Sequence, residues 1–314
     1  MSAMEPDNRA IPELPRPAPR LTLGPLLFHW PRAQRRDFYA RIADEAAVDC
    51  VYLGEVVCSK RLSWFAEDLP QIAERLRRSG KQVVMSTAAL IASDQEAAVV
   101  RDLCAAGALI EVNDLAALHL LAGHGFVSGP LINAFNEGTL DVLRRLGAVR
   151  IAMPVELSAT AIAILAAHNA GGETEVFAFG RQPLAISQRC YHARAHDLHK
   201  DACRFVCGHD ADGMAVAQLD ERPLFTINGT QTLSHGYVVM LDKLATLHRA
   251  GVTHFRLSPQ TIDMVAVASL HRAVLDGLLD PEEAAARLGV LAAPVPFVNG
   301  YVNGHAGMAW LAGR

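Results

Sequence analysis

The chain has 314 residues, of which 51% are hydrophobic, and 29 Lys plus Arg against 33 Asp plus Glu give a net charge of −4. This near balance argues against non-specific nucleic-acid binding, which needs a basic stripe, so we predict no nucleic-acid partner. A large core can be buried, and no apolar stretch approaches the roughly 18–20 uncharged residues of a membrane span.

Residues 1–20 contain five prolines and no apolar signal-peptide segment, and we predict that they form a disordered tail. Residues 21–314 are predicted to be a single domain. Without a secretory signal, the chain is expected in the cytoplasm. Six cysteines in that reducing compartment are more often free thiols or metal ligands than disulfides.

Apolar, strand-like runs alternate with helix-like segments along the rest of the chain. Near-continuous apolar strands separated by helices indicate a parallel sheet with both faces covered. Eight such units predict a (β/α)8, TIM-barrel-like fold, with a doubly wound open sheet as the alternative. The predicted strands are 24–30, 48–55, 82–90, 108–114, 126–133, 150–157, 175–180 and 254–260. The predicted helices are 32–46, 65–79, 94–106, 114–123, 137–147, 158–170 and 261–276.

Residues 181–253 interrupt this rhythm between the seventh and eighth predicted strands. The segment is too long for a bare loop, so we predict an insertion with its own short strands and helix. It carries Cys190, Cys203 and Cys207, while Cys58 follows the second predicted strand. Since loops after barrel strands meet at one face, these four cysteines are expected to lie together.

Four converging thiolates suit either an iron–sulfur cluster or structural zinc. The spacing Cys190-x12-Cys203-x3-Cys207 lets the last two bind one metal from a single helical face or tight loop. Cys50, inside a strand, and Cys104, inside an Ala-rich helix, are predicted to be small core residues. Zinc remains an alternative because four histidines crowd the same segment. They are His192, His196, His199 and His209.

Polar residues at predicted strand ends are candidates for lining a pocket. Glu55, Asn133 and Glu156 are the candidate catalytic residues, with the two glutamates as a possible acid/base pair or as anchors for a substrate hydroxyl. Glu111 and Asp114 occupy similar positions, although helix capping is the preferred interpretation for Asp114. Ser158 is also well placed to cap a helix, and Lys60 and Arg61 could neutralise a metal centre or be ordinary surface charges.

Several segments of the chain resemble the collagenase-like peptidase family, in particular members that work in oxygen-independent ubiquinone biosynthesis. The resemblance covers almost everything after the Pro-rich tail, and YLGEVVCSKR with the cysteine spacing is its most specific part. The segments are LGPLLFHWP, YLGEVVCSKR, GKQVVMSTAALI, MPVELS, PLAISQRCYHAR, DACRFVC, NGTQTLS, RLSPQ and NGY.

The resemblance implies a 4Fe–4S cluster held by Cys58, Cys190, Cys203 and Cys207. It also implies a heterodimer with a UbiU-like paralogue that hydroxylates the aromatic ring of ubiquinone precursors without O2. Prephenate would be the oxygen donor, and a sterol-carrier-like lipid-binding accessory protein would deliver the prenylated quinone precursor.

Three other functions remain open at this point. The chain could be a zinc-stabilised, non-catalytic scaffold subunit, a peptidase as the family name suggests, or an RNA hydroxylase like other relatives. The sequence contains no H-E-x-x-H, G-x-S-x-G, G-x-x-x-x-G-K-[ST] or G-x-G-x-x-G motif, which weakens the zincin, hydrolase-elbow and nucleotide-binding readings.

Overall fold

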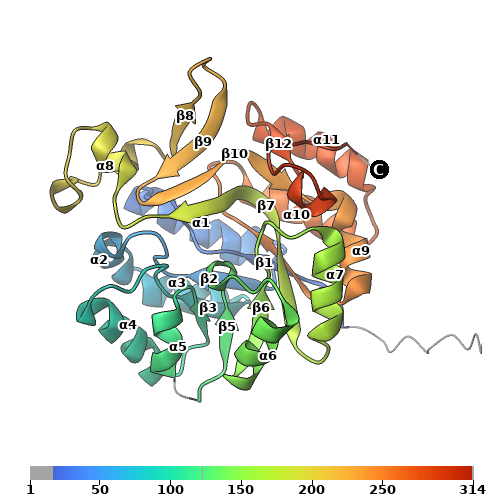
Figure 1. The fold of residues 1–314 in the computed structure, drawn as a ribbon, viewed down its shortest axis with the longest axis horizontal. Helices are drawn as coiled ribbons and strands as arrows, with labels where there is room; N and C mark the ends of the chain where they lie inside the picture. The colour runs from blue at the N-terminus through green and yellow to red at the C-terminus, as the bar shows by residue number, and fades with distance from the viewer. Residues whose placement is uncertain (1–16, 122, 313–314) are drawn as a thin grey trace, which may run out of the picture.

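A computed structural model describes residues 17–121 and 123–312, and in this part of the chain eight parallel strands close into a barrel. Each strand pairs with the next in sequence, and β7 and β1 both pair with β11, which closes the ring. Helices surround the barrel (Figure 1), so the predicted TIM-barrel-like fold is confirmed. The barrel strands are β1 (Arg20–Leu23), β2 (Cys50–Leu53), β3 (Gln82–Ser86), β4 (Ile110–Val112), β5 (Phe126–Ser128), β6 (Ala148–Ala152), β7 (Glu173–Ile186) and β11 (His254–Leu257).

Several of the outer helices begin at a polar side chain that accepts a hydrogen bond from the first turn, as expected of N-caps. Ser93, Asn136, Ser158 and Asp263 act in this way at α4, α6, α7 and α10. No helix in the described ranges is long and apolar enough to cross a membrane. The helices around the barrel are α1 (Arg32–Glu45), α2 (Leu62–Ala66), α3 (Leu69–Arg78), α4 (Asp94–Ala105), α5 (Leu115–Leu121), α6 (Glu137–Arg145), α7 (Ala159–His168), α9 (Leu244–Ala250), α10 (Met264–Leu275) and α11 (Pro281–Ala292).

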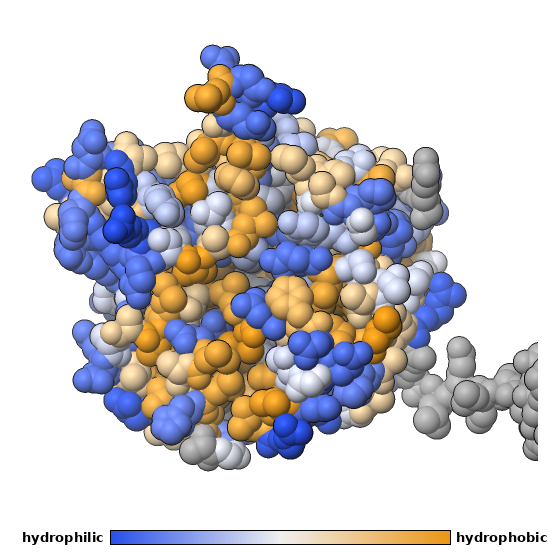
Figure 2. All heavy atoms as spheres, in the orientation of Figure 1, coloured by the Kyte–Doolittle hydropathy of each residue, from blue (hydrophilic) through white to orange (hydrophobic). Residues whose placement is uncertain are grey.

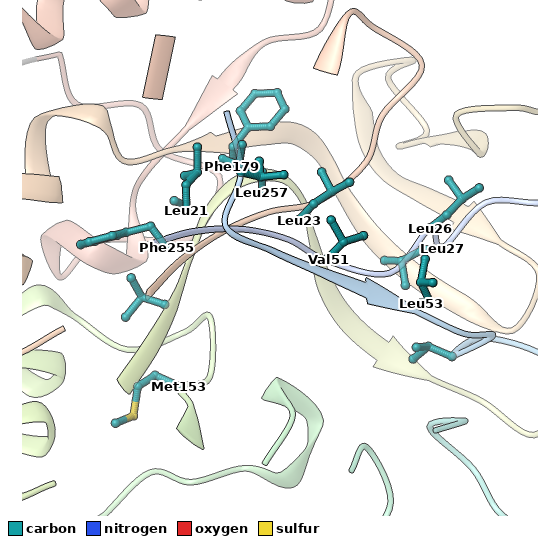
Figure 3. Close-up of a cluster of buried hydrophobic side chains, with 14 of the residues drawn as sticks. Leu21, Leu23, Leu26, Leu27, Val51, Leu53, Met153, Phe179, Phe255 and Leu257 are labelled. Atoms are coloured by element: carbon teal, nitrogen blue, oxygen red, sulfur yellow. The ribbon is translucent and has the colours of Figure 1, made fainter. Parts of the chain in front are cut away.

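Alternation along the strands divides the barrel into an apolar outer layer and a partly charged interior. Successive side chains of a strand point to opposite faces. The side chains that face the helices are apolar, and Figure 3 shows them packed over neighbouring strands. They include Leu21, Leu23, Val51, Leu53, Phe255 and Leu257. The residues between them in sequence, Thr22, Tyr52 and Arg256, take part in hydrogen bonds inside the barrel.

The prediction that the first strand spans residues 24–30 is wrong, because the strand is Arg20–Leu23 and the apolar run after it is a loop. Pro25 within this run cannot donate to a sheet ladder. Leu26, Leu27, Phe28 and Trp30 are nevertheless buried, which explains their apolar character. Arg20 therefore belongs to the barrel, and residues 1–16 of the predicted tail lie outside the described residues.

The chain between β7 and β11 carries three of the four marked cysteines. β7 continues beyond the barrel and pairs antiparallel with β10 (Gln231–Val239), which pairs in turn with β9 (Pro223–Asn228), and β9 pairs with β8 (Met214–Ala217). The β8–β9 hairpin projects from the barrel in Figure 1, with α8 (Tyr191–Ala195) beside it. We refer to residues 187–213, between β7 and β8, as the α8 segment; Cys190, Cys203 and Cys207 lie in it.

Candidate metal centre

All four marked cysteines line one cavity between the loop after β2 and the α8 segment. Cys58 precedes a short 3-10 helix after β2, and Cys190 is the N-cap of α8, where its Sγ accepts a hydrogen bond from the backbone N–H of Ala193 at 3.4 Å. The fold thus brings a distant cysteine next to the three that are close in sequence. The remaining residues that line the cavity are Lys60, Arg61, Lys200, Phe205, Val206 and Gly229.

Glu55 shapes the loop that presents Cys58. Its Oε1 accepts hydrogen bonds from the backbone N–H groups of Val57 and Cys58, both at 2.9 Å. The side chain is buried, and burial raises the pKa of this carboxyl, against the opposing effect of Arg61. In this structure Glu55 therefore contacts the backbone that positions Cys58.

Arg61 is a buried cation at the wall of the cysteine cavity. Its Nη1 donates to the carbonyl oxygen of Leu27 at 2.9 Å, and its Nη2 donates to Oδ1 of Asn228 at 3.1 Å. Nη1 also lies 4.0 Å from Oε1 of Glu55. A buried charge needs such partners, because an unpaired one costs several kcal/mol. Arg61 thus connects three separate parts of the chain beside the cysteines.

The turn between β9 and β10 closes the cavity on the other side. Gly229 has a φ of +64°, and a Cβ at this position would lie 2.6 Å from Nη2 of Arg61. Thr230 donates through Oγ1 to the carbonyl oxygen of Val57 at 2.7 Å. The backbone N–H of His192 in α8 donates to the carbonyl oxygen of Gly229 at 3.4 Å. A side chain at residue 229 would therefore be strained by the positive φ and would displace the guanidinium of Arg61.

Burial in this cavity disfavours ionisation of the cysteine thiols as long as no metal ion is bound. Burial raises the pKa values of Cys58, Cys190 and Cys207, while the positive charge of Arg61 acts in the opposite direction on all three. Neighbouring cysteines add to the effect at Cys190 and Cys207. A metal centre bound by these sulfurs would supply the missing positive charge and deprotonate them.

Cys50 and Cys104 lie elsewhere, as predicted. Cys50 is buried in β2, 3.6 Å from Nη1 of Arg150, and burial raises its pKa to about 12. Cys104 is half-buried in α4 and packs against the core. Among the described residues, no histidine lines the four-cysteine cavity, and His199 is largely exposed.

The candidate catalytic residues occupy two different cavities. Asn133 and Glu156 are exposed and line one cavity near the ends of β5 and β6, together with Asn113. Glu55 lines a separate, mainly apolar cavity between β2, β3 and α4. The structure therefore brings Asn133 and Glu156 together and does not bring Glu55 to them. Asp114 accepts hydrogen bonds from the backbone N–H groups of Ile91 and Ala116, in keeping with the predicted cap.

A charged network inside the barrel was not identified from the sequence. Arg256 bridges two buried carboxylates, with Nη1 at 2.6 Å from Oε1 of Glu111 and Nη2 at 2.9 Å from Oε2 of Glu175. The hydroxyl of Tyr52 donates to Glu175 and accepts from Nη1 of Arg150 at 2.9 Å. Burial opposes ionisation of Glu175, yet Arg256 and Arg150 lower its pKa to about 2. The sequence signal that could have indicated this network is the presence of Glu111, Glu175 and Arg256 within otherwise apolar strands.

Glu111 and Arg256 also line a small cavity at the carboxyl-terminal mouth of the barrel. This cavity shares Asn113 and Pro183 with the cavity of Asn133 and Glu156. Barrel enzymes carry out their chemistry at this face. The two adjoining cavities therefore offer one place for a small substrate near the ends of the strands.

Comparison with solved structures finds matches at low sequence identity and low TM-score. Dihydrodipicolinate synthase from Agrobacterium tumefaciens str. C58 is 15% identical, with 86% of this chain and 79% of that chain covered and a TM-score of 0.46. Dihydropteroate synthase from Burkholderia cenocepacia is 13% identical, with 86% and 93% covered and a TM-score of 0.41. N-acetylneuraminate lyase from Fusobacterium nucleatum is 10% identical, with 86% and 79% covered and a TM-score of 0.37.

The sequence model of peptidase family U32 matches residues 39–309. This range includes the barrel from the second half of α1 onward, all four cysteines of the cavity and the turn that carries Gly229. The chain therefore belongs to peptidase family U32.

Proposed function

We propose that the chain is the iron–sulfur subunit of an O2-independent hydroxylase complex that acts on the aromatic ring of ubiquinone precursors, similar to UbiV in family U32. The observation that carries the proposal is the cavity lined by Cys58, Cys190, Cys203 and Cys207. Four thiolates beside a buried arginine suit a 4Fe–4S cluster, whose potential depends on charge and burial around the sulfurs.

The four cysteines would hold the cluster, which supplies transfer of single electrons when bound. Arg61 would offset part of the negative charge of the sulfurs and keep the β2 loop against the β9–β10 turn. Phe205 lines the cavity, and its ring lies 5.2 Å from that of Trp64 and 5.5 Å from that of His29. These three rings would limit access of water from one side.

Asn133 and Glu156, at the mouth of the barrel, would orient the reacting ring or the oxygen donor through hydrogen bonds. In the net reaction a ring C–H becomes C–OH and loses two electrons. The donor, for which we propose prephenate, gives up one oxygen atom and gains those two electrons. The partners would be a UbiU-like paralogue in a heterodimer and a sterol-carrier-like protein that delivers the prenylated precursor, all in the cytoplasm.

The same four cysteines also suit structural zinc, and the chain would then be a scaffold for a catalytic partner. Metal analysis separates the two functions, because zinc binding requires no inorganic sulfide. The family name suggests peptide hydrolysis, and turnover on a panel of peptides would favour that activity over hydroxylation.

The proposal is tested in cells of the source organism that lack the gene. We expect ubiquinone to be lost during growth without oxygen and retained during growth with oxygen. A plasmid copy with Cys203→Ala should fail to restore it, whereas Cys104→Ala, which changes a half-buried cysteine outside the cavity, should restore it. Normal ubiquinone without oxygen in the deletion strain would overturn the proposal.

A further inference from the structure

We propose that His192, His196 and Asp210 form a second metal site, separate from the four cysteines, for a divalent transition metal ion such as Zn²⁺. One potential ligand atom from each of these residues lies within 4.8 Å of the others. Two imidazoles and a carboxylate form a ligand set that zinc commonly uses, with a remaining position for water or another side chain.

The two histidines are arranged by α8 itself. His192 is the second residue of α8 and His196 is its C-cap, four residues further on, so the two side chains lie on the same side. Their rings are stacked, with centroids 5.7 Å apart and an interplanar angle of 8°. This spacing lets one helical face supply two nitrogen ligands to one ion.

Asp210 reaches the same point from the other end of the α8 segment. Its Oδ2 lies 2.8 Å from Nε2 of His192. Asp210 is half-exposed, and the ring of the adjacent His209 lies 6.1 Å from that of His196. His209 is therefore close enough to be a candidate for the remaining position on the ion.

His192 is buried beside a carboxylate and a second imidazole. The side chain is fully buried, and its Nδ1 has no hydrogen-bond partner among the residues that the structure describes. Buried polar atoms are normally paired, and a buried imidazole that meets a carboxylate and a second imidazole is a common arrangement for a metal ligand. The complete burial of His192 and the convergence of the three potential ligand atoms are the two observations that support the site.

The α8 segment has little apolar material to hold it together. Within residues 187–213, all of which are described, the buried apolar side chains are Ala193, Val206 and Cys207. Figure 2 shows that the surface around α8 is mainly hydrophilic. Small units without a sufficient core are usually stabilised by cross-links such as metals.

The position of the site suggests what the ion would do. His192 lies two residues after Cys190, and Asp210 lies three residues after Cys207. An ion bound to His192 and Asp210 would fix the two ends of the segment that carries Cys190, Cys203 and Cys207. The three metal ligands do not line the cysteine cavity, so the two sites can be emptied separately.

The test is metal analysis of the full-length protein purified anaerobically and equilibrated with micromolar ZnCl2, followed by gel filtration. The variants are His196→Ala and Asp210→Asn, with His199→Ala as the matched control. His196 and His199 are both exposed histidines of the same segment, but His199 lies outside the ligand set. We expect one zinc per chain in the wild type and in His199→Ala, and nearly complete loss of zinc in His196→Ala and Asp210→Asn.

Cys203→Ala separates this site from the cysteine cavity. Zinc that is retained in Cys203→Ala and lost in His196→Ala supports the second site, whether or not the wild type contains iron and sulfide. Zinc that is lost in Cys203→Ala and retained in His196→Ala would overturn it, as would a wild type that binds no zinc outside the cysteines. Iron and sulfide content, measured on the same samples, reports on the proposed function independently.

Discussion

Nη2 of Arg61 donates a hydrogen bond to Oδ1 of Asn228, 167 residues further along the chain, at a distance of 3.1 Å. Asn228 in turn donates through Nδ2 to the carbonyl oxygen of Leu27 at 2.7 Å, and Arg61 donates to the same oxygen. The loop after β1, the loop after β2 and the β9–β10 turn thus meet at one guanidinium beside the cysteines. The cavity lined by the four cysteines depends on this long-range junction as much as on the spacing of the cysteines in the sequence.

Replacing Arg61 with Met should destabilise the protein strongly. The change leaves the buried Glu55 without its cation and removes the hydrogen bonds to Leu27 and Asn228. Breaking a buried charge pair in this way costs about 3–5 kcal/mol. Urea unfolding of anaerobically purified protein measures the free energy, with the exposed Arg36→Met as the control. Equal stability of the two variants would contradict the role given to Arg61.

Gly229→Ala should be more destabilising than Gly277→Ala. Both glycines have a left-handed backbone, with φ values of +64° and +70°, so both substitutions introduce strain of about 1–2 kcal/mol. A Cβ at residue 229 would also meet Nη2 of Arg61 at 2.6 Å, whereas a Cβ at residue 277 meets open space. We expect an additional loss of about 1–3 kcal/mol for residue 229, as in overpacked sites. Urea unfolding measures the free energy of unfolding of both variants. Equal losses would show that a Cβ at residue 229 makes no unfavourable contact with Arg61.

The barrel interior can be probed with Tyr52→Phe. The substitution removes the hydroxyl that donates to Glu175 and accepts from Arg150, and it leaves both partners buried. An unsatisfied buried group costs about 1–3 kcal/mol. The midpoint of urea unfolding should therefore fall, while Tyr191→Phe, which alters an exposed tyrosine, should leave it unchanged. A Tyr52→Phe protein as stable as the wild type would argue against a tightly coupled network.

Stability should fall as the pH is lowered from about 6.5 toward 4. Burial lowers the pKa of His271 from 6.5 to about 4, so the unfolded chain binds a proton in this range that the folded protein does not. The free energy of unfolding therefore rises with pH across this window, by up to about 1.4 kcal/mol per pH unit for each such histidine. His254 shows the same shift, caused by burial and by Arg150.

His271→Asn should reduce this pH dependence. Asn can replace the hydrogen bond that Nδ1 of His271 makes with the carbonyl oxygen of Val267, but it does not titrate. The measurement is the free energy of urea unfolding at pH 7, 6 and 5 for both proteins. The slope against pH should be smaller in the variant, and an unchanged slope would show that His271 is not one of the groups responsible.

Much of the fold could be predicted because local pattern and tertiary structure agree. Ser93 and Ser158 mark helix starts, and the buried runs at residues 50–53 and 254–257 are strands. The first strand was misplaced because the run at 24–30 is apolar for a different reason. It is a buried loop whose Leu27 carbonyl oxygen accepts hydrogen bonds from Arg61 and Asn228. Apolar composition predicts that a run is buried, but it does not distinguish a loop from a strand.

The site was partly accessible from the sequence. Cys190, Cys203 and Cys207 are close in sequence, so their convergence could be predicted, and the structure places all three in one cavity with Cys58. The hydrogen bonds from the backbone of the Cys58 loop to Glu55 were harder to predict from the sequence, because a carboxyl group after a strand can face either a pocket or the backbone. Arg256 and Glu175 lie on the adjacent strands β11 and β7, but the pairing of Arg256 with Glu111 on β4 depends on which side chains meet across the barrel interior, which the order of strands does not specify.

The most direct test of the proposed cluster is anaerobic purification followed by visible absorption and by iron, sulfide and zinc analysis. The proteins are the wild type, Cys203→Ala and the control Cys104→Ala. We predict a coloured wild type and control with about four irons and four sulfides per chain, and loss of both in Cys203→Ala. A colourless wild type that carries zinc in the cysteine cavity without sulfide would contradict the iron–sulfur account.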